Sequence, residues 1–141
     1  MKKIIFLLGV MTFAATVSGQ GVPKDAEGYP SFKMPDGDTV YTMKMYYMVF
    51  LKKGENRSQD STEAAEIQMK HQAHISWMAE EGYVIMAGPF ADKGEVSGIL
   101  VFNAKTREKV EELASMDPAV KAGRLILEIH PWWAAKGTKL N

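Results

Sequence analysis

The order of the apolar segments along this chain restricts it to few folds. Four runs rich in aromatic and aliphatic side chains alternate with two stretches of helical periodicity, in the order strand, helix, strand, strand, helix, strand. The predicted strands are 41–51, 83–87, 96–102 and 125–129, and the predicted helices are 60–81 and 106–115. This order predicts a ferredoxin-like βαββαβ sandwich, an α+β fold with an antiparallel sheet.

The predicted strands have apolar side chains on both faces. In the first strand, Met45, Tyr47 and Val49 lie on one face, and Tyr46, Met48 and Phe50 lie on the other. Two helices cover only one face of such a sheet, and a large exposed apolar patch usually marks an interface. We therefore expect a homodimer that packs sheet against sheet and forms an α/β barrel. The alternative is a monomer whose own N-terminal arm covers the sheet.

The N-terminus has the pattern of a secretory signal peptide. Lys2 and Lys3 precede an apolar run, and Val17 and Gly19 provide small residues at its exit. The run is shorter than the roughly 20 apolar residues that a membrane span needs, so we expect no stable membrane anchor. The prediction is cleavage after Gly19 and export to the periplasm or the medium.

The predicted organisation is therefore a signal peptide at 1–19, an arm or linker at 20–40, one domain at 41–135 and a tail at 136–141. The arm is predicted to be extended because prolines and glycines punctuate it without apolar periodicity.

Composition excludes several classes of function. The 17 lysine and arginine residues balance the 17 aspartate and glutamate residues, so the formal net charge is 0. Cleavage of the predicted signal peptide removes Lys2 and Lys3 and changes this charge to −2. A nucleic-acid partner is not expected at this charge. The sequence contains no cysteine, which excludes a thiol nucleophile, a thiolate metal site and a disulfide.

The first predicted helix brings one histidine to its apolar face. Residues at three- and four-residue steps share this face, namely Ala64, Ile67, His71, Ile75 and Met78. His71 is therefore either a hydrogen-bonded core histidine or a site residue facing the sheet. His74 makes a metal-binding pair geometrically possible, but no third ligand accompanies it, so we predict neither a metal nor a cofactor.

Asp92 follows the second predicted strand and is the candidate partner of His71. The far end of that strand is expected to return toward the middle of the first helix, where a carboxylate orients an imidazole for general base catalysis. The alternative is that Asp92 only stabilises a hairpin turn. Tyr47 and Ser97 are polar residues of the predicted strands that can line the same cavity.

From residue 46 to residue 133 the sequence resembles the YCII-related family of ferredoxin-like dimers. The resemblance is carried by His71 eleven residues before Gly82, by residues 87–89 with Asp92, by Gly98, by residues 117–123 and by residues 130–133. It implies a cavity centred on a His/Asp pair, which we place at His71 and Asp92. With this cavity we assign Tyr47, Gly88, Pro89 and Ser97 to substrate binding.

The resulting functional hypothesis is a cofactor-free lyase or isomerase. His71 would abstract a proton from a small ring-shaped or carbonyl-activated substrate, and Asp92 would hold the productive tautomer. Two alternatives stay open. The first is a homodimer that binds a small ligand without changing it, and the second is a purely structural pair of core polar groups.

Overall fold

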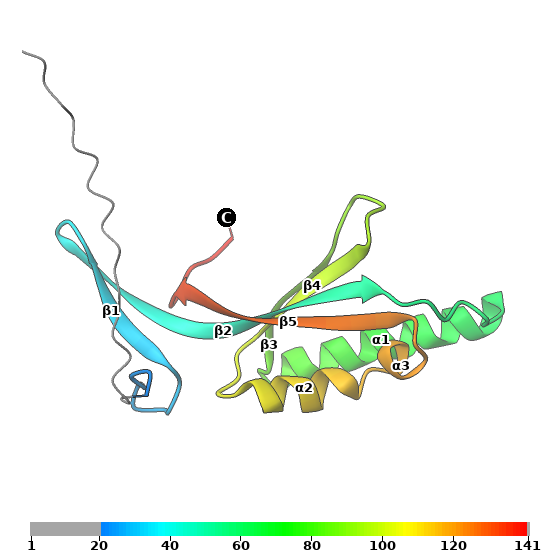
Figure 1. Ribbon diagram of the computed structural model, residues 1–141, viewed down its shortest axis with the longest axis horizontal. Coiled ribbons are helices and arrows are strands. Elements are labelled where there is room, and N and C mark those ends of the chain that lie inside the picture. Colours follow the sequence, from blue (N-terminus) through cyan, green and yellow to red (C-terminus); the bar gives the residue numbers. More distant parts are fainter. Residues whose placement is uncertain (1–20, 141) are drawn as a thin grey trace, which may run out of the picture.

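The computed structural model describes residues 21–140, so the predicted signal peptide lies outside the described residues. The predicted order of strands and helices is confirmed, with one strand added before it and one short helix added within it (Figure 1). The elements are β1 (Ser31–Asp36), β2 (Thr39–Lys53), α1 (Ser61–Glu80), β3 (Val84–Pro89), β4 (Val96–Phe102), α2 (Arg107–Ser115), α3 (Pro118–Lys121) and β5 (Leu125–Ala135).

All five strands form one antiparallel sheet around β2. One edge of β2 pairs with β5 along its length, while the other edge pairs first with β1 and then with β4, which in turn pairs with β3. Without β1, the strand order is β5-β2-β4-β3, with the first and third strands of the βαββαβ unit at the centre. This arrangement is the predicted ferredoxin-like sheet.

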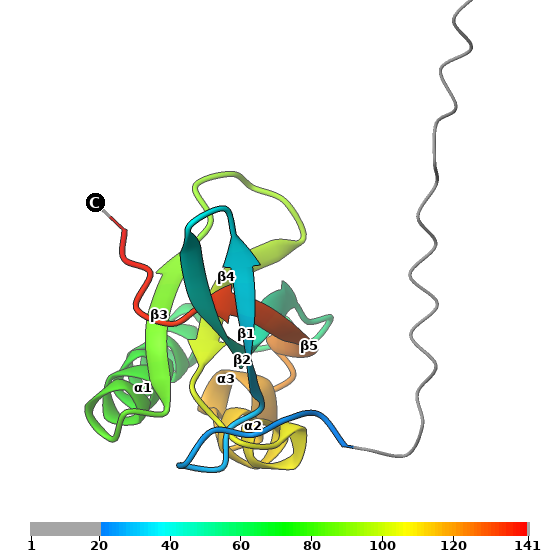
Figure 2. The same cartoon turned by 90° about the vertical axis from the view of Figure 1, so that its left-hand side faces the viewer.

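The helices lie together on one face of the sheet, as both views show (Figures 1 and 2). Apolar side chains fill the space between these layers; the fully buried ones include Val49, Leu100, Phe102, Met78 and Val110. Asp60 caps α1 by accepting a hydrogen bond from the backbone N–H of Glu63 (2.8 Å). None of the helices within residues 21–140 is long and apolar enough to cross a membrane.

Part of the segment predicted to be an extended arm is a strand. β1 forms a hairpin with the first half of β2, and Gly37 takes a positive φ of 56° in the connecting turn. Phe32 of β1 packs edge-to-face against Trp133, with ring centroids 4.9 Å apart. This strand was not predicted because Pro35 interrupts its pattern. A proline is tolerated there because β1 lies at the edge of the sheet.

The last strand is six residues longer than predicted. We expected it to end at Ile129, but β5 continues through the His130-Pro131-Trp132-Trp133 segment to Ala135. Pro131 does not stop the strand, because β5 is an edge strand and the missing N–H can face away from β2. The additional length pairs with residues 43–48 of β2 and so extends the sheet beyond the helix layer.

Candidate active site

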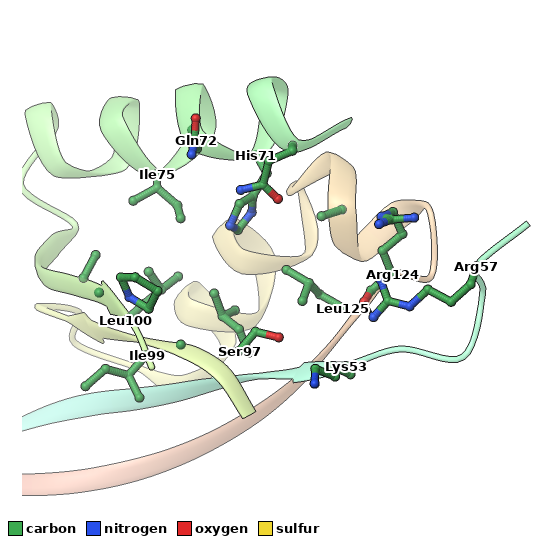
Figure 3. A pocket seen from close by; sticks show the side chains of 17 residues that line it. Lys53, Arg57, His71, Gln72, Ile75, Ser97, Ile99, Leu100, Arg124 and Leu125 are labelled. Carbon is green, nitrogen blue, oxygen red and sulfur yellow. Dashed lines mark hydrogen bonds between the residues drawn. The ribbon is translucent and has the colours of Figure 1, made fainter. Parts of the chain in front are cut away.

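A cavity of about 660 Å³ lies between α1 and the sheet (Figure 3). His71, Gln72 and Ile75 of α1 form one side of the cavity, and the backbones of β3 and β4 approach from the other side. The two strands lie close at this point, since a Cβ added to Gly98 would lie 2.6 Å from the carbonyl oxygen of Gly88. This volume is within the range of pockets that hold small organic molecules.

His71 is paired with a buried carboxylate. Its Nδ1 lies 2.6 Å from Oδ2 of Asp117, and the two side chains are 10% and 3% exposed. α1 provides the histidine at an inward-facing position. The aspartate stands between α2 and α3, 46 residues further along the chain.

Asp117 is held in place by the start of α3. It is the N-cap of that helix, and its Oδ1 accepts a hydrogen bond from the backbone N–H of Ala119 (2.8 Å). One carboxylate oxygen therefore caps α3 and the other contacts His71. Because both oxygens have partners, the direction of the carboxylate is fixed before any substrate binds.

The contact with Asp117 determines which nitrogen of His71 can react. A carboxylate only accepts hydrogen bonds, so Nδ1 of the imidazole carries the proton and donates it to Oδ2. In the neutral ring, Nε2 then has a free lone pair, and the hydrogen bonds of the described residues give Nε2 no partner. His71 lines the cavity, so its free nitrogen is available to a bound molecule as a general base.

Asp92, the predicted partner of His71, does not make this contact. It lies exposed in the turn after β3, where its Oδ1 accepts a weak hydrogen bond from the N–H of Gly94 (3.3 Å). The turn extends away from the helix layer in both views (Figures 1 and 2), whereas the prediction required it to return toward α1. We therefore replace Asp92 by Asp117 as the partner of His71.

The structure brings three of the four predicted substrate-binding residues to the cavity. Gly88, Pro89 and Ser97 line it, but Tyr47 does not. Tyr47 lies in the core four residues before the cavity-lining Leu51, about 13 Å away along an extended strand. Burial raises the pKa of the Tyr47 phenol, and the nearby Glu108 carboxylate raises it further.

Comparison with protein families gives one decisive match. The model of the YCII-related domain matches residues 45–133, which include both His71 and Asp117. The chain belongs to the YCII-related domain family.

One of the solved structures that match the chain has low similarity to it. It is 5-chloro-2-hydroxyhydroquinone dehydrochlorinase from Burkholderia phenoliruptrix AC1100, in complex with 2,5-dihydroxybenzoquinone, with 17% identity and a TM-score of 0.45, covering 62% of this chain and 92% of that chain. A likeness at this level carries no inference about substrate. No curated protein matches the chain.

The second histidine of α1 in this YCII-related domain has a packing role. His74 donates a hydrogen bond from Nε2 to the carbonyl oxygen of Leu113 in α2 (3.0 Å), and its ring stacks on Trp77 with centroids 5.5 Å apart. The hydrogen bond of His74 therefore links α1 to α2. In the part of the chain that the structure describes, no three His, Asp or Glu side chains are grouped as metal ligands.

Several residues at the cavity of this YCII-related domain were not predicted from the sequence. Asp117 lies in the segment 117–123 that carries the family resemblance, but no role at the site was assigned to it from the sequence. An aspartate followed by a proline is the start signal of a helix. Lys53, Arg57 and Arg124 also line the cavity, and no local motif marked them.

Replacement of Asp117 by asparagine tests the pair. Asn still caps α3 through its amide oxygen, so Asp117→Asn removes mainly the acceptor of the His71 Nδ1 proton. We expect a loss of about 1–3 kcal/mol in the free energy of unfolding, measured by urea denaturation. The ¹⁵N shifts of the His71 ring should also show that Nδ1 is no longer the uniformly protonated nitrogen.

The matched control is Asp92→Asn, which makes the same chemical change in an exposed turn. It should alter the free energy of unfolding by no more than about 0.5 kcal/mol. Equal effects of the two substitutions, or an unchanged His71 tautomer in Asp117→Asn, would contradict the assignment of Asp117.

Proposed function

We propose that this YCII-related domain protein is a general acid–base enzyme, a lyase or isomerase that acts on a small organic substrate without a cofactor. The observation that carries the proposal is the buried 2.6 Å contact between His71 and Asp117, with the imidazole facing a cavity of substrate size. A histidine with only a structural role would normally have both nitrogens satisfied in the core.

The reaction begins with proton abstraction. Nε2 of His71 takes a proton from a carbon that a neighbouring carbonyl group acidifies, and the electron pair of the broken C–H bond passes into an enolate. The imidazolium that forms is stabilised by the Asp117 carboxylate on its other side. Return of the proton to a different atom completes an isomerisation, whereas departure of a β-substituent with the electron pair completes an elimination.

Hydrogen exchange between substrate and solvent tests this step directly. In D₂O, the wild-type protein should catalyse loss of the C–H proton signals of small carbonyl compounds, and phenylpyruvate, phenylacetone and cyclohexanone are suitable probes. Because His71 is the base, His71→Asn should lower the exchange rate by about 10²–10⁴-fold for any probe that the wild type accepts. Proton NMR spectra recorded over time give the rates.

Lys70→Gln is the control on the same helix, since Lys70 is exposed and pairs with Glu66. It should leave the exchange rate unchanged. Catalysis that persists in His71→Asn would overturn the proposal. A probe that binds stoichiometrically but is released unchanged by the wild type, with no exchange for any probe, would instead favour the non-catalytic binder.

We further propose that two copies pack through the sheet face that the helices leave open. Ile126 (51% exposed) and Trp132 (41% exposed) lie on this face with the half-buried Met48 and Phe50. Lys52 and Glu128 on the same face form an ion pair (3.1 Å), so the face carries both charges beside its apolar residues. Such a surface suits a second copy of itself.

A charge placed on the open face should separate the copies. Ile126→Glu is expected to convert the dimer into a monomer with unchanged far-UV circular dichroism. Burying a carboxylate in the apolar contact costs more free energy through lost hydration than its cross-strand neighbour Lys52 returns. Light scattering coupled to size-exclusion chromatography gives the mass. Met69→Glu is the control on the helix layer, where Met69 is 63% exposed, and should remain dimeric. A monomeric wild type would contradict the proposal.

Export is the third part of the proposal, and the pattern of residues 2–19 supports it. We expect the protein recovered from outside the cytoplasm to begin at Gln20, as determined by N-terminal sequencing. Leu8→Arg places a charge in the apolar run and should retain the uncleaved chain inside the cell. An exported chain that still begins at Met1 would contradict cleavage after Gly19.

A further inference from the structure

Three cationic side chains meet at one end of the cavity. Lys53 is the last residue of β2, Arg57 lies in the loop before α1, and Arg124 immediately precedes β5. Figure 3 shows the three heads grouped beyond His71, with Ile75 and Leu100 at the opposite end. The lining contains no Asp or Glu, and none of the ion pairs among residues 21–140 involves any of the three cations.

The hydrogen bonds of these cations go to neutral oxygens. Arg57 donates to the carbonyl oxygen of Arg124 (3.1 Å), and Lys53 donates to that of Lys93 (3.0 Å). Arg124 donates to the side-chain oxygen of Gln59 (2.8 Å). These contacts position the side chains but leave their three positive charges uncompensated.

The backbone brings the two arginines together from distant parts of the chain. The N–H of Gly54 donates to the carbonyl oxygen of Arg124 (2.8 Å), and a Cβ at residue 54 would lie 2.1 Å from the carbonyl oxygen of Gly123. Asn56 reinforces the junction by donating to the carbonyl oxygens of Ala122 and Gly123. The cationic end of the cavity is thus built into the fold.

Grouped positive charges repel one another, and a cleft lined by one sign of charge concentrates ions of the opposite sign. Arginine side chains in particular match the paired oxygens of a carboxylate or a phosphate. The apolar side chains at the opposite end suit a hydrocarbon body, and His71 lies between the two ends (Figure 3).

We propose that the cavity binds an organic oxyanion, whose carboxylate or phosphate lies among Lys53, Arg57 and Arg124 and whose apolar body lies against Ile75 and Leu100. This inference rests on the proposed function, because it places the reacting carbon of an anionic substrate between those ends, at Nε2 of His71. Lys53, Arg57 and Arg124 are the residues that select the substrate.

Binding of simple probes tests the inference without turnover. Phenylacetate and phenyl phosphate carry the two kinds of oxyanion on one aromatic body, and phenylacetamide is the uncharged counterpart of phenylacetate. We expect both anions to bind with dissociation constants in the millimolar range, as suits fragments of this size, and the amide to bind at least about 10-fold more weakly. Titrations followed by ¹H–¹⁵N spectra give the constants, and their ratio shows whether the site prefers carboxylate or phosphate.

Neutral substitutions identify the residues responsible. Arg124→Gln and Arg57→Gln should each weaken binding of the preferred anion by about 10-fold. Lys53→Gln should weaken it by about 3-fold, because a lysine lacks the paired donors with which an arginine binds two oxygens. Lys70→Gln is the control, since it removes the same charge from an exposed residue that pairs with Glu66 and does not line the cavity. Arg57→Lys retains the charge and should recover part of the affinity.

Three results would overturn the inference: equal binding of phenylacetamide and phenylacetate, cavity variants that behave like Lys70→Gln, or no binding of either anion in the millimolar range. The same titrations in His71→Asn separate the two proposals. Anion binding that survives in this variant is independent of the proton transfer. Conversely, hydrogen exchange that depends on His71 but is unaffected by the arginine substitutions would leave the proposed reaction intact and remove only the anion site.

Discussion

Pairing of β2 along both of its edges is the constraint on which the rest of the molecule depends. This strand is 15 residues long, and its backbone hydrogen bonds hold β5 on one edge and β1 and β4 on the other. Its inward side chains, such as Val49 and Leu51, form part of the core beneath the helices. The side chain of Lys53, at its end, lines the cavity, so the same strand that organises the sheet also reaches the candidate active site.

The contact between His71 and Asp117 depends on the short helix α3, which lies outside the sheet. The four-residue α3 is too short to be stable as an isolated helix, and Asp117 fixes its first turn. One oxygen of the Asp117 carboxylate accepts the capping hydrogen bond, and the other oxygen faces His71. The side chain of Asp117 therefore both starts α3 and orients the His71 imidazole.

The sequence predicts those parts of the molecule that local patterns encode. The apolar runs give the strands, and Asp60 and Gly82 mark the ends of α1. The inward position of His71 follows from helical periodicity. The partner of His71 does not follow from any local pattern, because Asp92 and Asp117 both stand beside a turn signal and only the three-dimensional course of the chain selects between them.

The same limit applies to the cationic end of the cavity. Arg57 and Arg124 are 67 residues apart, and they meet because two loops approach closely at Gly54 and Gly123. β1 and the end of β5 were missed for another reason: Pro35 and Pro131 normally argue against a strand, but both occur where an edge strand needs no N–H donor at that position.

A single stretch of eight residues, 117–124, contains the carboxylate that orients the base, the Ala119 wall of the cavity and one of its cations. An insertion or deletion within this stretch would change the His71–Asp117 contact and the charge of the cavity in one event. In directed evolution, altered specificity is best sought at residues 53 and 57, which lie outside this stretch.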